Sequence, residues 1–337
     1  MSAAWLVLLA VGGAAAPADA VAQDAAPPPA VHEEARYLMG TLATVRAEAP
    51  AAATAQAAVD AAWAAFALVD SLMSTWREDS DLVRANAGAA AGPVRVDPRL
   101  AGLAARALDL AAASDGAFDP TVLPLMRAWG LRDGPPRRPD AAALGRARSA
   151  VGHRLVQVDT VAATVAFARP GTALDLGGIA KGYALDLARA AMAAAGAAAG
   201  VLDLGGNLLV FGAGAHEVGI VAPDDPAAVV ATVTVGEGAV ATSGQYERFV
   251  AADGERWGHI LDPRRGEPVP RSGSVTIVAP TGELADALAT AVFVLGPREG
   301  AAFAARFPGV GCVFVTAAPD GGWAVVRSGA PDPGRSR

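Results

Sequence analysis

The stretch ALDLGGIAKGYA, residues 173–184, combines a short apolar run, a carboxylate, two glycines and a lysine. The pattern predicts a strand that ends at Asp175, a turn through Gly177 and Gly178, and a helix that carries Lys181 in its first turns. Glycines let a ligand approach the backbone, and free amides at a helix start favour phosphate. A lysine is poorly placed near a helix N-terminus, so an anionic ligand would explain Lys181. The alternative is a surface lysine after an ordinary tight turn.

A second stretch, ELADALATAVFVL at residues 283–295, predicts a buried helix that is apolar almost all round. Asp286 and Thr290 interrupt the apolar pattern at a spacing of i and i+4, which places them on one face. An unpaired buried carboxylate is costly, and a hard cation would satisfy it. Oxygen ligands of this kind suit magnesium, which takes its remaining ligands from phosphate or water. The alternative is an aspartate in the first turn and a threonine bonded back to the backbone.

A third stretch, GHILDPRRG at residues 258–266, predicts a strand that ends in an Asp-Pro turn. His259 and Asp262 are candidates for proton transfer or ligand orientation, and a plain hairpin turn is the alternative. Weaker candidate segments are Met39–Thr41, Met73–Trp76 with Ser80, and Gly116–Thr121.

The remaining pattern predicts an α+β fold with mixed, mostly antiparallel sheets and flanking helices. Strands are expected over 36–48, 155–158, 164–167, 201–211, 218–222, 229–235, 248–252, 257–261, 274–279, 311–316 and 323–327. Helices are expected around Val59–Met73, from Asp97 with Pro98 in the first turn, and over 179–195, 283–295 and 298–307. Most strands are joined by short Gly, Pro and Asp turns, which favours α+β over a doubly wound sheet.

The composition excludes several classes of function. The 337-residue chain has a formal net charge of −7 and no basic stripe, which argues against nucleic acid as a partner. Its one cysteine, Cys312, lies in an apolar run, so a disulfide framework or a thiolate metal site within the chain is excluded. The four histidines are far apart and none lies in an H-E-x-x-H pattern, which gives a zinc hydrolase little support.

The N-terminal sequence predicts export. Residues 3–16 form an apolar stretch that ends near Ala18-Asp19-Ala20, a small-x-small pattern typical of signal-peptide cleavage. This stretch is shorter than the roughly 20 apolar residues that span a bilayer. We expect a signal peptide over 1–22, a flexible leader over 23–35, one domain over 36–328 and a disordered tail over 329–337. An over-extended start codon is the alternative, because the first residues carry no Lys or Arg.

Taken together and in order, these segments resemble the ApbE family, the FAD:protein FMN transferases. The resemblance extends over most of the chain, through Met39–Thr41, Phe118–Pro120, Asp175–Gly182, Leu202–Asn207, Ser243–Gly244, His259–Pro263 and Asp286–Thr290. It implies a single α+β flavin-transferase domain that binds FAD in a cleft.

The resemblance also implies roles for single residues. Magnesium would be held by Asp286, Thr290 and a backbone carbonyl, by position that of Gly178. FAD contacts carry over to Met39, Trp76, Ala117, Phe118, Asp119, Asp175, Lys181 and His259. Lys181 would assist the phosphate charge, and His259 or Asp262 is a candidate base. Many relatives carry a lipidated cysteine after the signal, and none exists here, so a soluble periplasmic form is expected.

The activity implied is magnesium-dependent transfer of the FMN part of FAD to a Thr or Ser hydroxyl of another protein, with release of AMP. Exported acceptor flavoproteins, such as membrane redox subunits, are the expected partners, and no transmembrane segment is expected in the mature chain. Two alternatives stay open at this point. One is an FAD pyrophosphatase that yields FMN and AMP, and the other is a non-enzymatic periplasmic flavin-binding protein.

Overall fold

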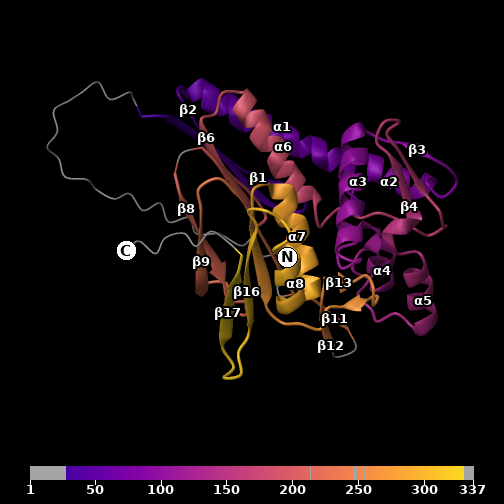
Figure 1. Ribbon diagram of the computed structural model, residues 1–337. Helices are drawn as coiled ribbons and strands as arrows, with labels where there is room; N and C mark the ends of the chain where they lie inside the picture. Colours follow the sequence, from indigo (N-terminus) through magenta and orange to yellow (C-terminus); the bar gives the residue numbers. More distant parts are fainter. Residues whose placement is uncertain (1–27, 213, 246–248, 253–254, 330–337) are drawn as a thin grey trace, which may run out of the picture.

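An eight-stranded antiparallel sheet runs through the molecule (Figure 1). The computed structural model describes residues 28–212, 214–245, 249–252 and 255–329. Across the sheet, the strands are β1 (Ala30–Leu38), β2 (Thr41–Ala49), β6 (Ala199–Leu204), β7 (Asn207–Phe211), β10 (Gly238–Gly244), β15 (Ser274–Ala279), β16 (Gly311–Ala317) and β17 (Trp323–Ser328). Every neighbouring pair is antiparallel, so the predicted α+β class is confirmed.

Helices cover one face of this sheet. They are α1 (Ala52–Met73), α6 (Ala180–Ala194), α7 (Gly282–Leu295) and α8 (Pro297–Ala304). Trp63 and Phe66 of α1 belong to the same main core as Leu202 and Ile277 of the sheet. Burying side chains of this size stabilises a fold by about 1.5–3 kcal/mol each.

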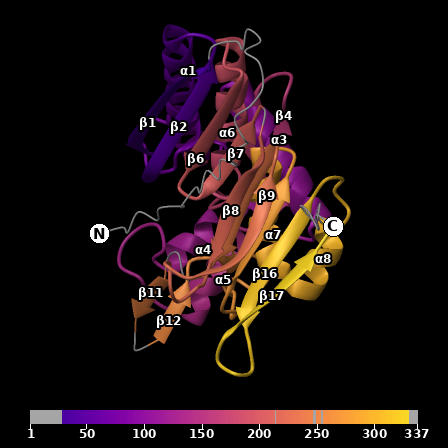
Figure 2. The same ribbon diagram turned by 90° about the vertical axis from the view of Figure 1, so that its left-hand side faces the viewer.

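A β-hairpin, β8 (His216–Val221) with β9 (Val229–Val235), covers the opposite face (Figure 2). Neighbouring residues of β7 point to the two faces, because strand side chains alternate. Leu209 lies in the helix-side core, and Leu208 packs with Val218 and Val233 under the hairpin. The sheet is therefore buried on both faces at its centre.

A second group of elements lies beside the sheet (Figure 1). It comprises α2 (Asp81–Gly88), α3 (Pro98–Ala113), α4 (Leu123–Ala128), α5 (Ala141–Ser149), the 3₁₀ turns η1 (Pro120–Val122) and η2 (His153–Leu155), and a small sheet of β3 (Val94–Arg95), β5 (Thr164–Phe167) and β4 (Val156–Asp159). The paired strands β11 (Phe249–Ala252) and β12 (Glu255–Gly258), and β13 (Leu261–Asp262) and β14 (Glu267–Pro268), complete the fold. As predicted, Asp97 caps α3, with its carboxylate accepting from the Arg99 amide at 2.8 Å.

The N-terminal ends of α6 and α7 pack closely because both carry glycine at the contact. A Cβ on Gly182 would lie 2.0 Å from the carbonyl oxygen of Gly282, so any side chain there would force the helices apart. Asp186 of α6 adds a cap to α7, since its carboxylate accepts from the amides of Gly282 at 2.7 Å and Glu283 at 2.8 Å. This contact joins two segments that are far apart in the sequence.

Two predicted strands turn out to be hairpins. The expected strand 36–48 is β1 and β2 joined by Met39 and Gly40, whose φ angles of 51° and 75° suit a two-residue hairpin turn. The expected strand 201–211 is β6 and β7 joined in the same way by Gly205 and Gly206, at φ 65° and 88°. The first turn was not predicted, because a non-glycine residue such as Met39 rarely adopts a positive φ.

Two further expectations are corrected. The flexible leader expected over 23–35 ends before residue 30, because residues 30–35 pair in register with β2. The central strand β10 was not predicted. Its sequence, GAVATSG, is rich in small residues of low strand propensity, and it is held by pairing with β7 and β15 on either side.

The predicted signal peptide, residues 1–22, lies outside the described residues. Within the described residues, α1 is long and apolar enough to cross a membrane by composition. Its apolar side chains, including Val59, Trp63 and Phe66, lie in the core, and core helices have the same length and composition.

Candidate active site

The glycine-rich turn and the polar face of α7 lie against each other. A Cβ built on Gly178 would lie 3.2 Å from Oγ1 of Thr290. One turn earlier on α7, Asp286 is 6% exposed and its Oδ2 accepts from the amide of Gly182 at 2.9 Å. Gly178, Asp286 and Thr290, the residues proposed as metal ligands from the resemblance, are therefore brought together.

This arrangement fits a hard cation. Oδ1 of Asp286 accepts no hydrogen bond from the described residues, so one oxygen of a buried carboxylate is left for another partner. Among the described residues, no group of three or more His, Cys, Asp and Glu side chains could hold a metal. The donors at this position are instead one carboxylate, one hydroxyl and the backbone of the turn. That oxygen set is typical of magnesium, which keeps ligands from water and phosphate.

The amides at the start of α6 are mostly engaged within the protein. Those of Ile179 and Ala180 both donate to the carbonyl of Leu176, at 3.0 and 2.8 Å, and that of Gly182 donates to Asp286. The turn into α6 consumes these three amides, whereas the amides of Gly178 and Lys181 donate to no described residue, so a phosphate contact at this helix start stays a prediction. Lys181, in the first turn of α6, adds a positive charge at the same place.

Asp175 ties the glycine-rich turn to two other segments. Its Oδ1 accepts from the amide of Gly177 at 2.8 Å, and its Oδ2 accepts from the hydroxyl of Thr75 at 3.1 Å. Its own amide donates to the carbonyl of Pro120 at 2.7 Å. Asp175 therefore fixes the turn relative to the end of α1 and to the segment that follows Asp119.

Trp76 presents an aromatic face at this junction. Trp76 is 68% exposed, although it is a large hydrophobic residue. The Arg132 guanidinium lies 3.5 Å from the ring centroid and also donates to the carbonyl of Thr75. A tryptophan with an arginine packed on its ring provides a flat surface on which a planar ligand ring can stack.

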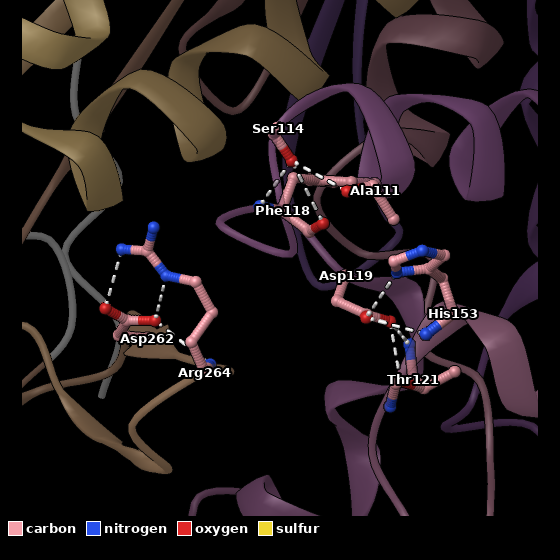
Figure 3. Close-up of polar contacts among 9 residues, drawn as sticks. Ala111, Ser114, Phe118, Asp119, Thr121, His153, Asp262 and Arg264 are labelled. Carbon is pink, nitrogen blue, oxygen red and sulfur yellow. Dashed lines mark hydrogen bonds and ion pairs between the residues drawn. The ribbon is translucent and has the colours of Figure 1, made fainter.

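The turn around Phe118 and Asp119 forms another wall of the site (Figure 3). A Cβ on Gly178 would lie 3.3 Å from Cε2 of Phe118. Asp119 is 6% exposed, and its carboxylate accepts from the Thr121 hydroxyl at 2.6 Å and the His153 amide at 2.9 Å. Because both carboxylate oxygens of Asp119 accept hydrogen bonds from the protein, Asp119 stabilises the turn. Ala117 is buried beside it.

Lys181 has a carboxylate nearby that was not singled out from the sequence. Burial raises the pKa of Asp203 above its ordinary value, and the amide of Gly206 and the charge of Lys181 act in the opposite direction. Asp203 lies at the end of β6, and Gly205 after it packs on Thr41, next to the Met39–Gly40 turn. The expected FAD contact Met39 and the expected catalytic residue Lys181 therefore lie on adjoining segments.

We predict that Lys181→Met raises the pKa of Asp203 further, because the variant removes a charge that stabilises the carboxylate. A raised folded-state pKa means that the protonated acid contributes stability below its unfolded pKa, and this contribution is lost as pH rises through the folded value. Carboxyl carbon shifts followed by NMR across pH would measure the pKa in both proteins. An unchanged Asp203 pKa in Lys181→Met would contradict their proximity.

Asp262 is held too firmly to act readily as a base. It is 6% exposed, and the Arg264 side chain donates to both of its oxygens at 2.9 Å (Figure 3). The Arg264 amide donates to it as well, at 3.0 Å, which makes Asp262 the organising residue of the β13–β14 turn. His259 is half-buried at the end of β12. Gln245 holds the next residue, Ile260, by two hydrogen bonds.

Comparison with known proteins decides the family. A model of the ApbE family matches residues 39–314, which is most of the chain. The chain belongs to the ApbE family. It is 37% identical to a protein of Treponema pallidum named FAD:protein FMN transferase, over 84% of each chain. A Rhodobacter capsulatus protein of the same name is 35% identical over 91% of this chain, which spans only 61% of that relative.

Solved structures agree with the ApbE assignment. The crystal structure of the Pseudomonas stutzeri flavinyl transferase ApbE in its apo form has a TM-score of 0.78 and 30% identity, and the match covers 89% of this chain and 95% of that one. The family prediction made from the order of the motifs is confirmed. Thr75 and Asp203 lay within segments named from the sequence, Met73–Trp76 and Leu202–Asn207, but were given no role of their own, and Arg132 was not named. Asp203 precedes a Gly-Gly turn and Thr75 precedes Trp76, which are the only local signals for them.

Proposed function

We propose that this flavin transferase moves the FMN part of FAD onto a Thr or Ser hydroxyl of an acceptor flavoprotein, in a reaction that requires magnesium and releases AMP. The observation that carries the proposal is the contact between the glycine-rich turn and α7. It sets a buried carboxylate oxygen without a described hydrogen-bond partner beside the Thr290 hydroxyl and the backbone of Gly178. The names of the relatives supply the substrate class.

The reaction balances without a further reactant. The acceptor oxygen attacks the phosphorus on the FMN side of the pyrophosphate, and a new P–O bond forms. The bond from that phosphorus to the bridging oxygen breaks, and AMP leaves with the electron pair. The hydroxyl proton is lost to a base or to water, and a phosphoester-linked flavin remains on the acceptor.

The residues of the chain position and neutralise the pyrophosphate. Asp286, Thr290 and the backbone of Gly178 would hold magnesium, which when bound supplies positive charge where negative charge develops. Lys181 supplies a second positive charge from the first turn of α6. Asp175 keeps the turn in place, and Trp76 supports a ring of FAD.

Proton removal needs little from the protein, because a loose phosphoryl-transfer transition state leaves the attacking hydroxyl only slightly acidified. His259 remains the candidate base. Asp262 is the weaker candidate, because the Arg264 side chain donates to both of its oxygens.

The direct test incubates the protein with FAD and a purified candidate acceptor, with and without a chelator. We expect flavin fluorescence on the acceptor band of a denaturing gel, matched by AMP release, and loss of both with chelator. Added magnesium should restore both. An acceptor whose target Thr is replaced by Val is the control.

The two alternatives give different results in the same assay. A pyrophosphatase would produce FMN and AMP and leave the acceptor unlabelled. A protein that only binds flavin would retain FAD and release no AMP at any magnesium concentration. Labelling that persists in chelator would contradict the metal requirement.

We also propose that the protein is exported and acts in the periplasm as a soluble form. The apolar stretch at residues 3–16 followed by Ala18-Asp19-Ala20 supports this. Expressed in a Gram-negative host, the protein should appear in the periplasmic fraction, and mass spectrometry should find a mature N-terminus near residue 21. An intact N-terminus in the cytoplasmic fraction would contradict export.

A further inference from the structure

A basic cleft lies next to the proposed reaction site. It has a volume of about 740 Å³ and runs between the turn at Gly116–Asp119, the segment from α5 to η2, and the Pro263–Arg264 turn. Figure 3 shows residues from two sides of it, Arg264 on one side and Asp119 and His153 on the other. Its lining carries four arginines, which are Arg148, Arg154, Arg169 and Arg264.

Three of these arginines have no carboxylate partner among the described residues. Arg264 is neutralised by Asp262, but Arg148, Arg154 and Arg169 are exposed and make no described ion pair. The acidic lining residues are Asp115 and Asp119, and the carboxylate of Asp119 is already engaged inside its turn. The cleft is therefore positively charged, although the formal net charge of the chain is −7. Such a patch attracts a negatively charged partner.

The cleft adjoins the reaction site through one short turn. Phe118 contacts the position of Gly178, where the pyrophosphate is proposed to bind, and its neighbour Asp119 lines the cleft. A hydroxyl that attacks phosphorus must come within bonding distance. The polypeptide that carries it must therefore lie along a surface that begins at this turn.

The charge of FAD does not account for the arginines. Its negative charge is on the pyrophosphate, which the proposed function places at Lys181 and the α7 face, whereas adenosine and the isoalloxazine are neutral. We propose that the basic cleft binds an acidic segment of the acceptor protein and so guides its Thr or Ser to the flavin phosphate. This inference rests on the proposed function, because it requires a protein acceptor.

The test compares two synthetic fluorescein-labelled peptides. Each carries one Thr, flanked in one peptide by a run of Glu and in the other by Gln at the same positions. At low salt, we expect fluorescence anisotropy to show the acidic peptide binding about tenfold more tightly, a preference that falls as salt screens the charges. The double variant Arg154→Glu/Arg169→Glu should lose this preference.

The matched control is Arg95→Glu/Arg298→Glu, which reverses two exposed arginines, in β3 and α8, outside the cleft. It should keep the preference for the acidic peptide. The Kd for FAD, measured by equilibrium dialysis, should be the same in all three proteins, and melting temperatures show whether each variant is folded.

Several outcomes would overturn the inference. Equal affinity for the two peptides is one, and an unchanged preference in Arg154→Glu/Arg169→Glu is another. A weakened Kd for FAD in that variant alone would assign the cleft to the dinucleotide. The readout is binding, so it does not depend on FMN transfer. An acidic-peptide preference in a protein that transfers no FMN would overturn the proposed function, and with it the role of the bound segment as an acceptor, and would leave the cleft as a site for acidic peptides.

Discussion

Replacing Asp286 by Asn is expected to lower the rate of FMN transfer on the order of 10²–10³-fold, the range found when one group that stabilises developing charge is removed. The side chain keeps its shape, and its amide oxygen can still accept from the Gly182 amide that Asp286 binds at 2.9 Å. What is lost is the negative oxygen available to a cation. The measurement is the rate of acceptor labelling, with AMP release followed in parallel, at saturating FAD and magnesium.

Asp186→Asn is the matched control for Asp286→Asn. Asp186 also accepts backbone amides at the α6–α7 contact, from Gly282 and Glu283, but it has no proposed metal role. We expect it to lower the melting temperature and to leave transfer nearly unchanged. Asp286→Ala should combine both effects, because it leaves the Gly182 amide unpaired, at a cost of about 1–3 kcal/mol. Near-normal labelling by Asp286→Asn at saturating magnesium would remove the metal assignment.

Gly182→Ala is expected to lower the free energy of unfolding by about 1–3 kcal/mol, the usual effect of overpacking a core. The new Cβ would lie 2.0 Å from the Gly282 carbonyl oxygen and 2.7 Å from the Cβ of Asp286. The ends of α6 and α7 must separate, which also moves Gly178 away from Thr290. Transfer should therefore fall together with stability, as measured by urea unfolding and acceptor labelling on the same samples.

Gly145→Ala is the control for the stability effect of this substitution. Gly145 lies inside α5, and an added Cβ would meet nothing within 4 Å. Alanine favours a helix over glycine by about 1 kcal/mol, so this variant should be as stable as the parent or slightly more so. If Gly182→Ala instead matched the parent in stability and activity, the close packing of α6 on α7 would be wrong.

Local sequence predicted those parts of the fold that depend on local chemistry. The strands over 164–167, 229–235 and 274–279 coincide with β5, β9 and β15, because each is rich in β-branched residues with turns on both sides. The helix α3 begins after Asp97, as the capping residue and Pro98 predict. By contrast, β10 has weak local preference and is held by its two neighbours.

In the candidate site, too, local sequence predicted some features and not others. The spacing of Asp286 and Thr290 placed them on one helix face, and the two glycines before α6 marked the turn at Gly178. The strand predicted to end at Asp175 was wrong, because residues 172–176 form no strand. The contact between the turn and α7 was expected only through the family resemblance. Local sequence does not show which distant segment packs on the polar face of α7. The proximity of Lys181 to Asp203 depends on how β6 lies beside α6. Contacts of this kind are set by tertiary packing and have no periodic signature.

The central claim is that a divalent cation binds between the α7 face and the glycine-rich turn. Crystals grown with FAD and Mn²⁺ in place of Mg²⁺ test it directly, because manganese gives an anomalous scattering signal that locates the ion. The account predicts an anomalous peak in coordination contact with Asp286 and Thr290, on the side that faces Gly178, and loss of that peak in Asp286→Asn. A manganese peak elsewhere in the molecule, with the space between Asp286 and Gly178 empty of metal, would contradict it.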